Sequence, residues 1–194
     1  MMLSRNAFAG LAVDYPDWVD EVVDWNRRYE SDDRKMALAI ELARENVTRD
    51  TGGPFGAAIF ERESGKLVAV GMNSVVRLNN SVLHAEIVAF MAAEHVLGSF
   101  TLAADGMPEH EVVSSCEPCA MCLGAILWSG AKRVVCGAAR EDATRLNFDE
   151  GPVFEQSYAY IEARGIEFLH GVRRDEARAV LELYRSRSGP IYNA

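Results

Sequence analysis

The sequence predicts a three-layer α/β/α sandwich around a mixed five-stranded sheet. The predicted elements follow the order helix, hairpin, helix, strand, helix, strand, helix, strand, helix. Strands joined through helices are usually parallel and carry those helices on the faces of the sheet, whereas a hairpin is antiparallel. The 194 residues, 49% of them hydrophobic, suffice for one domain with a sizeable core, and we find no internal repeat or linker.

The first 30 residues are predicted to form an N-terminal arm on a domain that spans residues 31–194. An apolar run over residues 7–13 follows Arg5 and ends at Asp14. Because this run is short for a secretion signal and acidic residues follow it, we interpret it as a docking arm. Four residues have the spacing of an apolar helix stripe and are expected to pack against the domain: Tyr15, Trp18, Val22 and Trp25.

A helix is predicted to begin after Ser31, which suits an N-cap, and to end at the Gly- and Pro-containing residues 50–54. Its expected buried stripe is Met36, Ile40, Ala43 and Val47. Two strand-like runs follow over residues 56–62 and 66–72, and the Ser-Gly pair between them predicts a hairpin. Asn73 ends the second strand, where an asparagine alone is more often a turn residue than a ligand contact.

The rest of the chain alternates between helices and strands. Further helices are predicted over residues 84–97, 118–128, 154–163 and from residue 175. Strands are predicted over residues 111–114, 133–137 and 166–170. The first of these helices offers four residues to a core: Ile87, Phe90, Met91 and Val96. The last helix offers Ala177, Val180, Leu181 and Tyr184, and a Gly-Pro pair at 189–190 ends it.

Two cysteines have the spacing of half a zinc site. Cys119 and Cys122 are three residues apart, so their sulfurs share one face of the first turn of a helix that Pro118 can open. The N–H groups and dipole at a helix N-terminus favour the thiolate form. His84 offers a third ligand, and Glu86 follows two residues later. Three protein ligands leave one position for water, as in catalytic zinc sites, and a carboxylate can accept the proton of that water.

Other interpretations of the cysteines and carboxylates are weaker. Cys116 extends the motif to C-x-x-C-x-x-C, which begins a ferredoxin-type iron–sulfur run, but no cysteine continues it. We therefore interpret Cys116 as a buried residue or a thiol near the site, and Cys136 as core. Glu117 is expected either to support the site or to have a capping or surface role. Asp149 and Glu150 precede a Gly-Pro pair, a pattern that usually marks an exposed turn. The other histidines, His95, His110 and His170, are expected to be structural or exposed.

The order H-x-E followed by P-C-x-x-C resembles the cytidine-deaminase-like zinc deaminases. Within that family the chain is similar to the bacterial guanine deaminases, from about residue 33 to the C-terminus. The segments that carry this similarity are residues 52–56, Asn73, residues 115–126, 142–143 and 147–150. The ending, residues 191–194, resembles members that accept the triazine ammeline besides guanine. The N-terminal arm is not part of the common pattern.

The resemblance implies a hydrolytic deamination of guanine to xanthine and ammonia, with Zn²⁺ held by His84, Cys119 and Cys122. It implies that Glu86 moves the proton of the attacking water and that Glu150 is a second acid, which binds the base edge and helps protonate the departing amine. The substrate contacts it implies are Asn73, Phe55, Ala85, Phe148 and Tyr192. It also implies a homodimer that exchanges its C-terminal segment.

Charge limits the partners of the chain. The net charge is −9, and the basic pairs at residues 132–133 and 173–174 are short, so we predict a small-molecule purine or triazine substrate and neither a nucleic-acid nor a membrane partner. The expected location is the cytoplasm. Deaminases of guanosine, cytosine or another amino-heterocycle, and less so of tRNA adenosine, are the alternatives, and a non-catalytic zinc-binding module is the alternative of another class.

Overall fold

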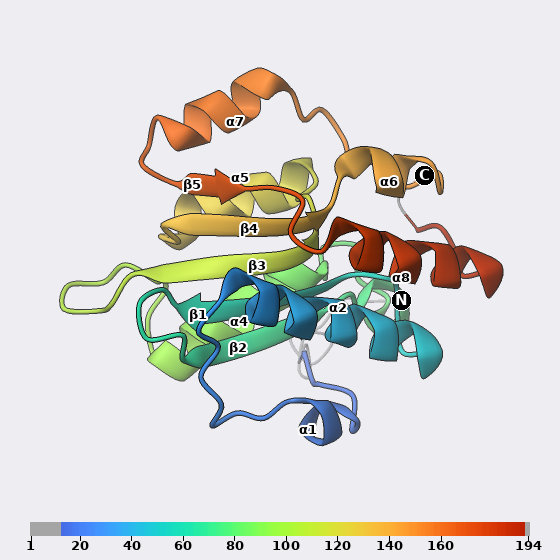
Figure 1. Cartoon of the computed structure of the whole chain (residues 1–194), viewed down its shortest axis with the longest axis horizontal. Coiled ribbons are helices and arrows are strands. Elements are labelled where there is room, and N and C mark those ends of the chain that lie inside the picture. Colours follow the sequence, from blue (N-terminus) through green and yellow to red (C-terminus); the bar gives the residue numbers. More distant parts are fainter. Residues whose placement is uncertain (1–12, 193–194) are drawn as a thin grey trace, which may run out of the picture.

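A computed structural model describes residues 13–192 of the chain. It contains one five-stranded mixed sheet with helices on both faces, which confirms the predicted three-layer sandwich (Figure 1). Most of the apolar run at residues 7–13 and the last two residues of the tail lie outside the described part. Within that part, every helix is too short or too polar to cross a membrane.

The strand order in the sheet is β2-β1-β3-β4-β5. Strand β1 (Gly56–Glu61) forms the predicted hairpin with β2 (Leu67–Met72) and pairs antiparallel with β3 (His110–Cys116) on its other side. Strands β4 (Arg133–Ala138) and β5 (Glu167–Leu169) continue the sheet in parallel with β3. All seven residues of β3 are buried, because this central strand has neighbours in the sheet and helices on both faces.

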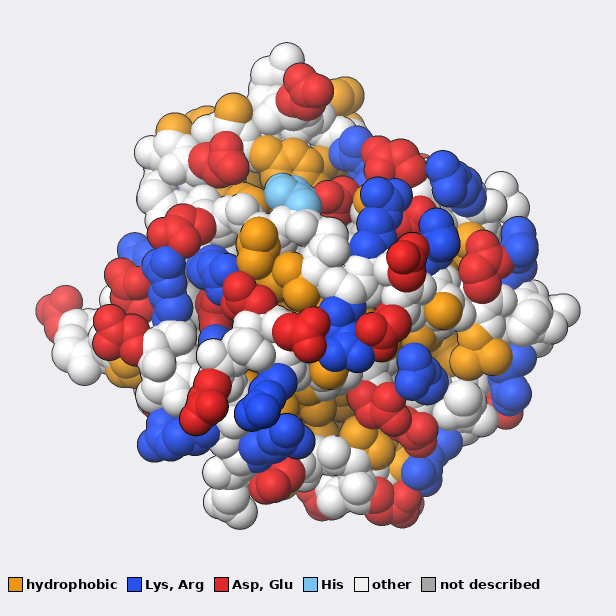
Figure 2. All heavy atoms as spheres, in the orientation of Figure 1, with side chains coloured by type: hydrophobic (Ala, Val, Ile, Leu, Met, Phe, Trp, Pro, Cys, Tyr) orange, Lys and Arg blue, Asp and Glu red, His pale blue; other side chains and the backbone are white. Residues whose placement is uncertain are grey.

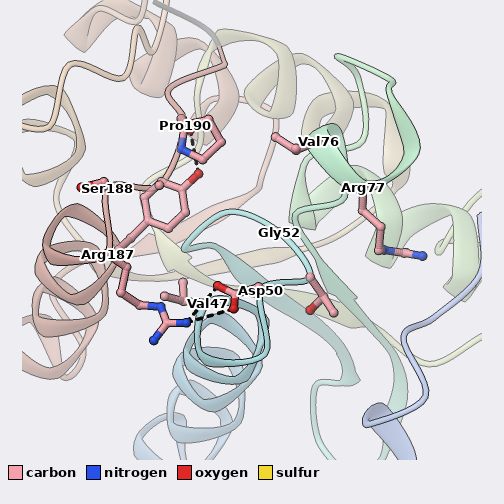
Figure 3. Close-up of a pocket in the computed structure, with 11 residues that line it drawn as sticks. Val47, Asp50, Gly52, Val76, Arg77, Arg187, Ser188 and Pro190 are labelled. Carbon is pink, nitrogen blue, oxygen red and sulfur yellow. Dashed lines mark hydrogen bonds and ion pairs between the residues drawn. The ribbon is translucent and has the colours of Figure 1, made fainter.

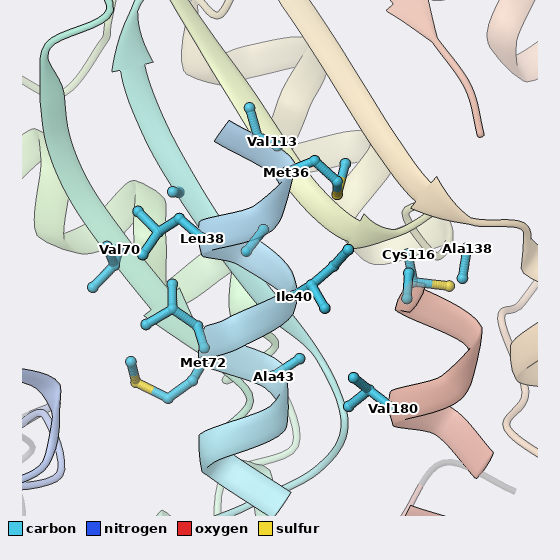
Figure 4. Close-up of a cluster of buried hydrophobic side chains, with 14 of the residues drawn as sticks. Met36, Leu38, Ile40, Ala43, Val70, Met72, Val113, Cys116, Ala138 and Val180 are labelled. Carbon is cyan, nitrogen blue, oxygen red and sulfur yellow. The ribbon is translucent and has the colours of Figure 1, made fainter. Parts of the chain in front are cut away.

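Helices α2 (Asp32–Thr48) and α8 (Arg174–Ser186) cover one face of the sheet. The Ser31 hydroxyl accepts a hydrogen bond from the N–H of Arg34, which is the predicted N-cap. The predicted buried residues of both helices are buried. Figure 4 labels three of those from α2, which are Met36, Ile40 and Ala43, together with Val180 of α8. The short α1 (Val19–Val22) precedes α2.

The opposite face is covered by α4 (Ala85–Leu97) and α5 (Ala120–Ser129), with α7 (Glu155–Glu162) beyond them. Two of the predicted core residues of α4 are wrong: Met91 is 46% exposed and Val96 is 66% exposed. The helix instead lies on the sheet through alanines, because Gly71 of β2 lets its backbone come very close. A Cβ at Gly71 would lie 2.1 Å from the carbonyl oxygen of Ala85.

Two short helices were not predicted. These are α3 (Val75–Leu78), after β2, and α6 (Arg140–Thr144), after β4. They are four and five residues long, which is too short for a periodic pattern to indicate them.

The described part of the N-terminal arm packs against the domain. Trp18 is 4% exposed and belongs to the core on the α2 side. The Tyr15 hydroxyl donates a 2.7 Å hydrogen bond to the carbonyl oxygen of Val70 in β2. Trp25, in contrast, is 38% exposed, since the arm forms only one turn of helix and cannot turn all four predicted residues inward.

Candidate active site

The three predicted zinc ligands lie together where two helices begin. His84 is the N-cap of α4, Cys119 is the N-cap of α5, and Cys122 lies in the first turn of α5. Their ligand atoms all lie within 4.8 Å of one another, and Cys119 Sγ is 3.5 Å from His84 Nδ1. Zinc bonds of about 2.0–2.3 Å place tetrahedral ligand atoms about 3.3–3.8 Å apart, so this set of a soft imidazole and two thiols fits the metal.

The cysteine helix begins two residues later than predicted. Pro118 does not open α5, because the extended backbone of Cys119 separates it from the first helical residue, Ala120. The N–H of Ala120 donates a 2.9 Å hydrogen bond to the carbonyl oxygen of Glu150. The segment that carries Glu150 is therefore fixed to the N-terminus of the cysteine helix.

The two thiols have different electrostatic surroundings. Hydrogen bonds from Cys122 and His84 lower the pKa of Cys119 to about 4, against the opposing effect of burial. The hydrogen bond with Cys119 and burial raise the pKa of Cys122, which donates to Glu86 Oε2 at 3.2 Å. Burial lowers the pKa of His84, but the neighbouring Cys119 and the charges of two glutamates outweigh it, and the net shift is upward. Zinc binding requires deprotonated thiols, so it releases the proton held by Cys122.

Glu86 points into the site from the first turn of α4. It is 6% exposed, and its Oε1 accepts a 3.0 Å hydrogen bond from the Ser114 hydroxyl of β3. Burial and the charge of Cys119 raise the pKa of Glu86. A buried carboxyl group with a raised pKa, held by the neutral hydroxyl of Ser114, is suited to accept and return a proton.

Glu150 is a second buried carboxyl group in the same pocket. The pocket is lined by Phe55, His84, Glu86, Cys116, Glu117, Cys119, Glu150 and Tyr192. Burial, followed by the charges of Cys119 and Glu86, raises the pKa of Glu150 to about 8. The Gly-Pro pattern predicts an exposed turn, and this prediction is wrong for Glu150, which is 7% exposed. The neighbouring Asp149 is exposed.

Aromatic side chains from three segments close the pocket. Phe148 lies with its ring centroid 5.1 Å from that of Phe55 and 5.2 Å from that of Tyr192. The Tyr192 ring lies edge-on to His84 at 6.5 Å. The described end of the C-terminal tail thus covers the site of its own chain. Ala85, the remaining predicted contact, is fully buried behind His84.

Two buried polar groups near the pocket have no hydrogen-bond partner. One is Asn73 Nδ2, and the other is the Tyr192 hydroxyl. The side-chain oxygen of Asn73 is used internally, since it accepts from the N–H of Val75 at 3.3 Å. A buried donor without a partner is costly, so these two groups are candidates to bind a polar ligand.

Comparisons with known proteins bear on this geometry. The sequence model of the cytidine and deoxycytidylate deaminase zinc-binding region matches residues 29–138, which is more than half of the chain. The chain belongs to this family. It is accordingly a zinc-dependent deaminase, and the predicted metal and enzyme class are confirmed.

Relatives of this deaminase include guanine deaminases. One from Bacillus subtilis is 38% identical over 133 residues, which cover 69% of this chain and 81% of the relative. A solved structure of a guanine deaminase from Nitrosomonas europaea is 41% identical, with a TM-score of 0.87 over 92% of this chain and 97% of that one. A further solved structure, of a complex with 2,6-diaminopurine, is 42% identical, with a TM-score of 0.89 over 95% and 97%.

Some residues around the deaminase site were missed or left open by the sequence. Ser114, the partner of Glu86, shares the α4 side of β3 with Val112, and the strand alternation could have indicated this. Glu117 has a capping role: it accepts from the N–H of Arg140 at the start of α6 and bonds His170 at 2.7 Å. The thiols of Cys116 and Cys136 are buried and free, as predicted. Among the other histidines, His95 is exposed, and buried His110 bonds a backbone carbonyl.

A second hollow of about 420 Å³ lies beside the loop that follows α2 and includes Thr51 and Gly52 (Figure 3). Gly52 and Val47 line one side of it, and Pro190 and Arg187 line the other. The Tyr184 hydroxyl donates a 2.6 Å hydrogen bond to the carbonyl oxygen of Pro190, and this bond holds the tail that leads to Tyr192.

Proposed function

We propose that this zinc-dependent deaminase converts guanine and water into xanthine and ammonia. The observation that carries the proposal is the presence of two buried carboxyl groups, Glu86 and Glu150, in one aromatic pocket beside the three ligand atoms. Replacing an amino group by oxygen needs one group to take a proton from water and one to give a proton to the departing nitrogen. The identity to guanine deaminases over most of the chain supports the choice of base.

The polar groups of the pocket match a purine base. Guanine presents acceptors at its ring nitrogens and carbonyl oxygen, and its amino group and ring N–H are donors. The unpaired Asn73 Nδ2 can donate to such an acceptor, and the Tyr192 hydroxyl can donate or accept. Glu150 can accept from the N–H edge, and Phe55, which lines the pocket and packs edge-on against the buried Phe148, bounds the flat ring. We propose these residues, with Ala85 behind them, as the substrate contacts.

We propose His84, Cys119 and Cys122 as the metal ligands. Zinc, when bound, lowers the pKa of a water molecule and so supplies a nucleophile at neutral pH. Glu86 takes the proton of that water and holds it at its carboxyl group, next to the Ser114 hydroxyl. It then delivers the proton to a ring nitrogen of the base while the new C–O bond forms at C2.

Glu150 completes the reaction at the departing amine. Its raised pKa, about 8, means that it carries a proton at neutral pH and can donate it to the exocyclic nitrogen as the C2–N bond breaks. The nitrogen leaves as ammonia, and the oxygen at C2 becomes a carbonyl as its remaining proton passes to Glu86. Glu86 then releases this proton to solvent and Glu150 takes one up, which restores both groups. The aromatic wall of Phe148 and Tyr192 limits the access of other water to these groups.

We do not favour tRNA adenosine as the substrate. A basic face that could follow a phosphate backbone is absent from the side of the described structure drawn in Figure 2, where positive and negative side chains alternate. Arg173 pairs with Asp33 and Glu176, and Arg174 pairs with Asp142, so the basic pair at 173–174 is neutralised by its own chain.

The test is ammonia release from guanine, guanosine, adenine, cytosine, cytidine and ammeline by the zinc-loaded protein. We expect guanine to be turned over fastest, with ammeline as the next candidate. Guanosine requires space for a ribose, and the pocket is closed by the tail. Absence of ammonia release from guanine alongside release from another substrate would overturn the proposal.

We also propose that the chain forms a homodimer in the cytoplasm and that the tail after Gly189 can exchange between the two copies. Large apolar side chains on α5 and near α7 support an interface, since Trp128 is 80% exposed and Phe154 is 61% exposed. All four thiols are free, which suits a reducing compartment. A monomer in light scattering at working concentration would contradict the dimer.

A further inference from the structure

Asn46, in the last turn of α2, is a fully buried polar residue that takes no part in the proposed reaction. Its Nδ2 donates two hydrogen bonds, to the carbonyl oxygen of Gly53 at 2.8 Å and to that of Asn73 at 2.9 Å. Its own carbonyl oxygen accepts from the N–H groups of Thr51 and Gly52. One residue therefore joins the end of α2, the loop that follows it and the end of β2.

The loop of Thr51, Gly52 and Gly53 lies between the tail over the site and the hollow of Figure 3, and two of its three residues have no side chain. On one side, a Cβ at Gly53 would meet the hydroxyl of Tyr192 at 2.2 Å, so the loop borders the tail over the site. On the other side lies the hollow of Figure 3, which Thr51 and Gly52 line. A Cβ at Gly52 would lie 2.0 Å from the carbonyl oxygen of Asn73, so glycine permits this close approach. The hydrogen bonds of Asn46 therefore hold the loop in place.

The direction of this hydrogen-bond chain is fixed at both ends. The Trp18 indole N–H, which can only donate, bonds the Thr51 hydroxyl at 3.0 Å. That hydroxyl in turn donates to Asn46 Oδ1 at 2.8 Å. The carbonyl oxygens of Gly53 and Asn73 can only accept, so the amide must present its oxygen to Thr51 and its nitrogen to them. The orientation of the amide is thus fixed, and the Thr51 hydroxyl has the backbone carbonyl oxygen of Asn46 as a second acceptor at 3.3 Å.

We propose that Asn46 is a positioning residue for the substrate pocket, and that Thr51 and Trp18 set the orientation of its amide. The N–H of Asn73 donates to the carbonyl oxygen of Phe55 at 3.0 Å, so a shift of Asn73 also reaches Phe55. The inference rests on the proposed function, because these two residues are proposed substrate contacts. It gives the N-terminal arm a role, since Trp18 precedes residue 29, where the family match begins.

The decisive variant is Thr51→Val, which keeps the shape of the side chain and removes the hydroxyl. Without that hydroxyl, Asn46 Oδ1 loses its side-chain donor, and only the two hydrogen bonds from Nδ2 still hold the amide. We expect the KM for guanine to rise about fivefold, the equivalent of about one hydrogen bond. The kcat should stay within about twofold and the zinc content at one per chain, because neither Glu86 nor the ligands touch Thr51. Thr51→Ser retains the hydroxyl and should restore the wild-type KM.

Two further variants probe the chain on either side of Thr51. Asn46→Ala should raise the KM by about tenfold or more, because it leaves the carbonyl oxygens of Gly53 and Asn73 without donors. The same loss lowers thermal stability. If Asn46→Ala does not fold, the result for Thr51→Val tests the inference instead. Trp18→Phe removes the outer N–H together with part of a buried ring, and we expect it to raise the KM about twofold. Its matched control is Trp25→Phe, because the Trp25 indole bonds Asp20 on the exposed side of the arm.

Hydrogen exchange of residues 51–56 and 73–76, read by mass spectrometry, reports the loop independently of any substrate. We expect faster exchange of both segments in Thr51→Val and wild-type exchange in Thr51→Ser. A wild-type KM together with wild-type exchange in Thr51→Val would overturn the inference. A lower unfolding temperature of this variant would not rescue it, because that would show a structural role alone. If the wild-type chain releases no ammonia from guanine, the proposed function fails, and the exchange measurement alone decides the positioning role.

Discussion

Two carboxyl groups are buried on opposite faces of strand β3, and the groups around them differ in charge. Glu111, on the α2 side, bonds the ammonium group of Lys35 and the guanidinium group of Arg133, the latter at 2.8 Å. Glu86, on the α4 side, accepts hydrogen bonds from the neutral hydroxyl of Ser114 and the thiol of Cys122. Both glutamates are at most 6% exposed.

The comparison separates a structural carboxylate from one that can exchange protons. Lys35 and Arg133 both bond Glu111, so its contribution is to join α2 to β3 and β4. Glu86 has no Lys or Arg in contact within the described structure, and burial raises its pKa, so its protonated form is easier to reach than that of an exposed glutamate. The surroundings of a buried carboxyl group, more than its burial, indicate which role it has.

The variant expected to have the largest effect on catalysis is Glu86→Gln. The amide keeps the shape and the bond from Ser114 but cannot carry a proton between water and base, so we expect guanine turnover to fall about 10²–10⁴-fold. Zinc content and unfolding temperature should stay near those of the wild type, as measured by metal analysis and thermal denaturation. Loss of zinc together with activity would instead make Glu86 a ligand.

On the other face of β3, Lys35→Met should affect stability without affecting chemistry. It removes one of the two cations of Glu111 while keeping most of the side-chain volume, so the free energy of unfolding should fall by about 3 kcal/mol. Chemical denaturation measures this change, and the kcat and KM for guanine of the folded protein should be those of the wild type. A changed kcat with unchanged stability would remove the distinction between the two glutamates.

Glu150 extends the comparison to a carboxyl group in the lid segment. We expect Glu150→Gln to keep zinc and fold but to lose guanine turnover about ten- to hundredfold, or about 1–3 kcal/mol of transition-state binding. Steady-state ammonia release measures this loss. The neighbouring exposed Asp149, which accepts from the N–H of Gly151, provides the control, and Asp149→Asn should have the smaller effect. Wild-type turnover of guanine by Glu150→Gln would refute the assigned role.

The smallest effect is expected at Asp142, a buried carboxylate with a cation partner at a helix start. Hydrogen bonds from Arg174 lower its pKa, and it also accepts from the N-cap N–H of Ala139. A lowered pKa stabilises the fold above the ordinary pKa of Asp, and this contribution is lost as the pH falls below about 4. Asp142→Asn should therefore cost about 1 kcal/mol at pH 7 and progressively less on acidification, as followed by denaturation at several pH values. A difference in unfolding free energy between wild type and Asp142→Asn that does not change with pH would contradict this role of Asp142.

Much of the fold and the metal corner of the site could be predicted from sequence. Zinc restricts both the type and the spacing of its ligands, so His84, Cys119 and Cys122 can be recognised without coordinates. Long helices such as α2 and α8 have enough turns for their buried stripes to be read from the sequence. The roles of Glu86 and Glu150 and the substrate contacts remain proposals.

The parts that sequence could not predict depend on distant partners. Met91 and Val96 are exposed because α4 approaches Gly71 through alanines. The positions of the apolar residues in the sequence do not indicate that this face of the helix lies on the sheet. Asn46 lies in a predicted helix, but its partners, Gly53 and Asn73, are 7 and 27 residues away. Nothing in the local sequence of such a residue distinguishes it from a surface asparagine.

Zinc titration of metal-free protein, with xanthine formation from guanine as the readout, tests the central claim most directly. We predict that activity rises in proportion to added zinc and saturates at one zinc per chain, and that Cys119→Ala binds no zinc at this site and forms no xanthine. Full activity of the metal-free wild type, or of Cys119→Ala, would contradict a zinc-dependent guanine deamination at His84, Cys119 and Cys122.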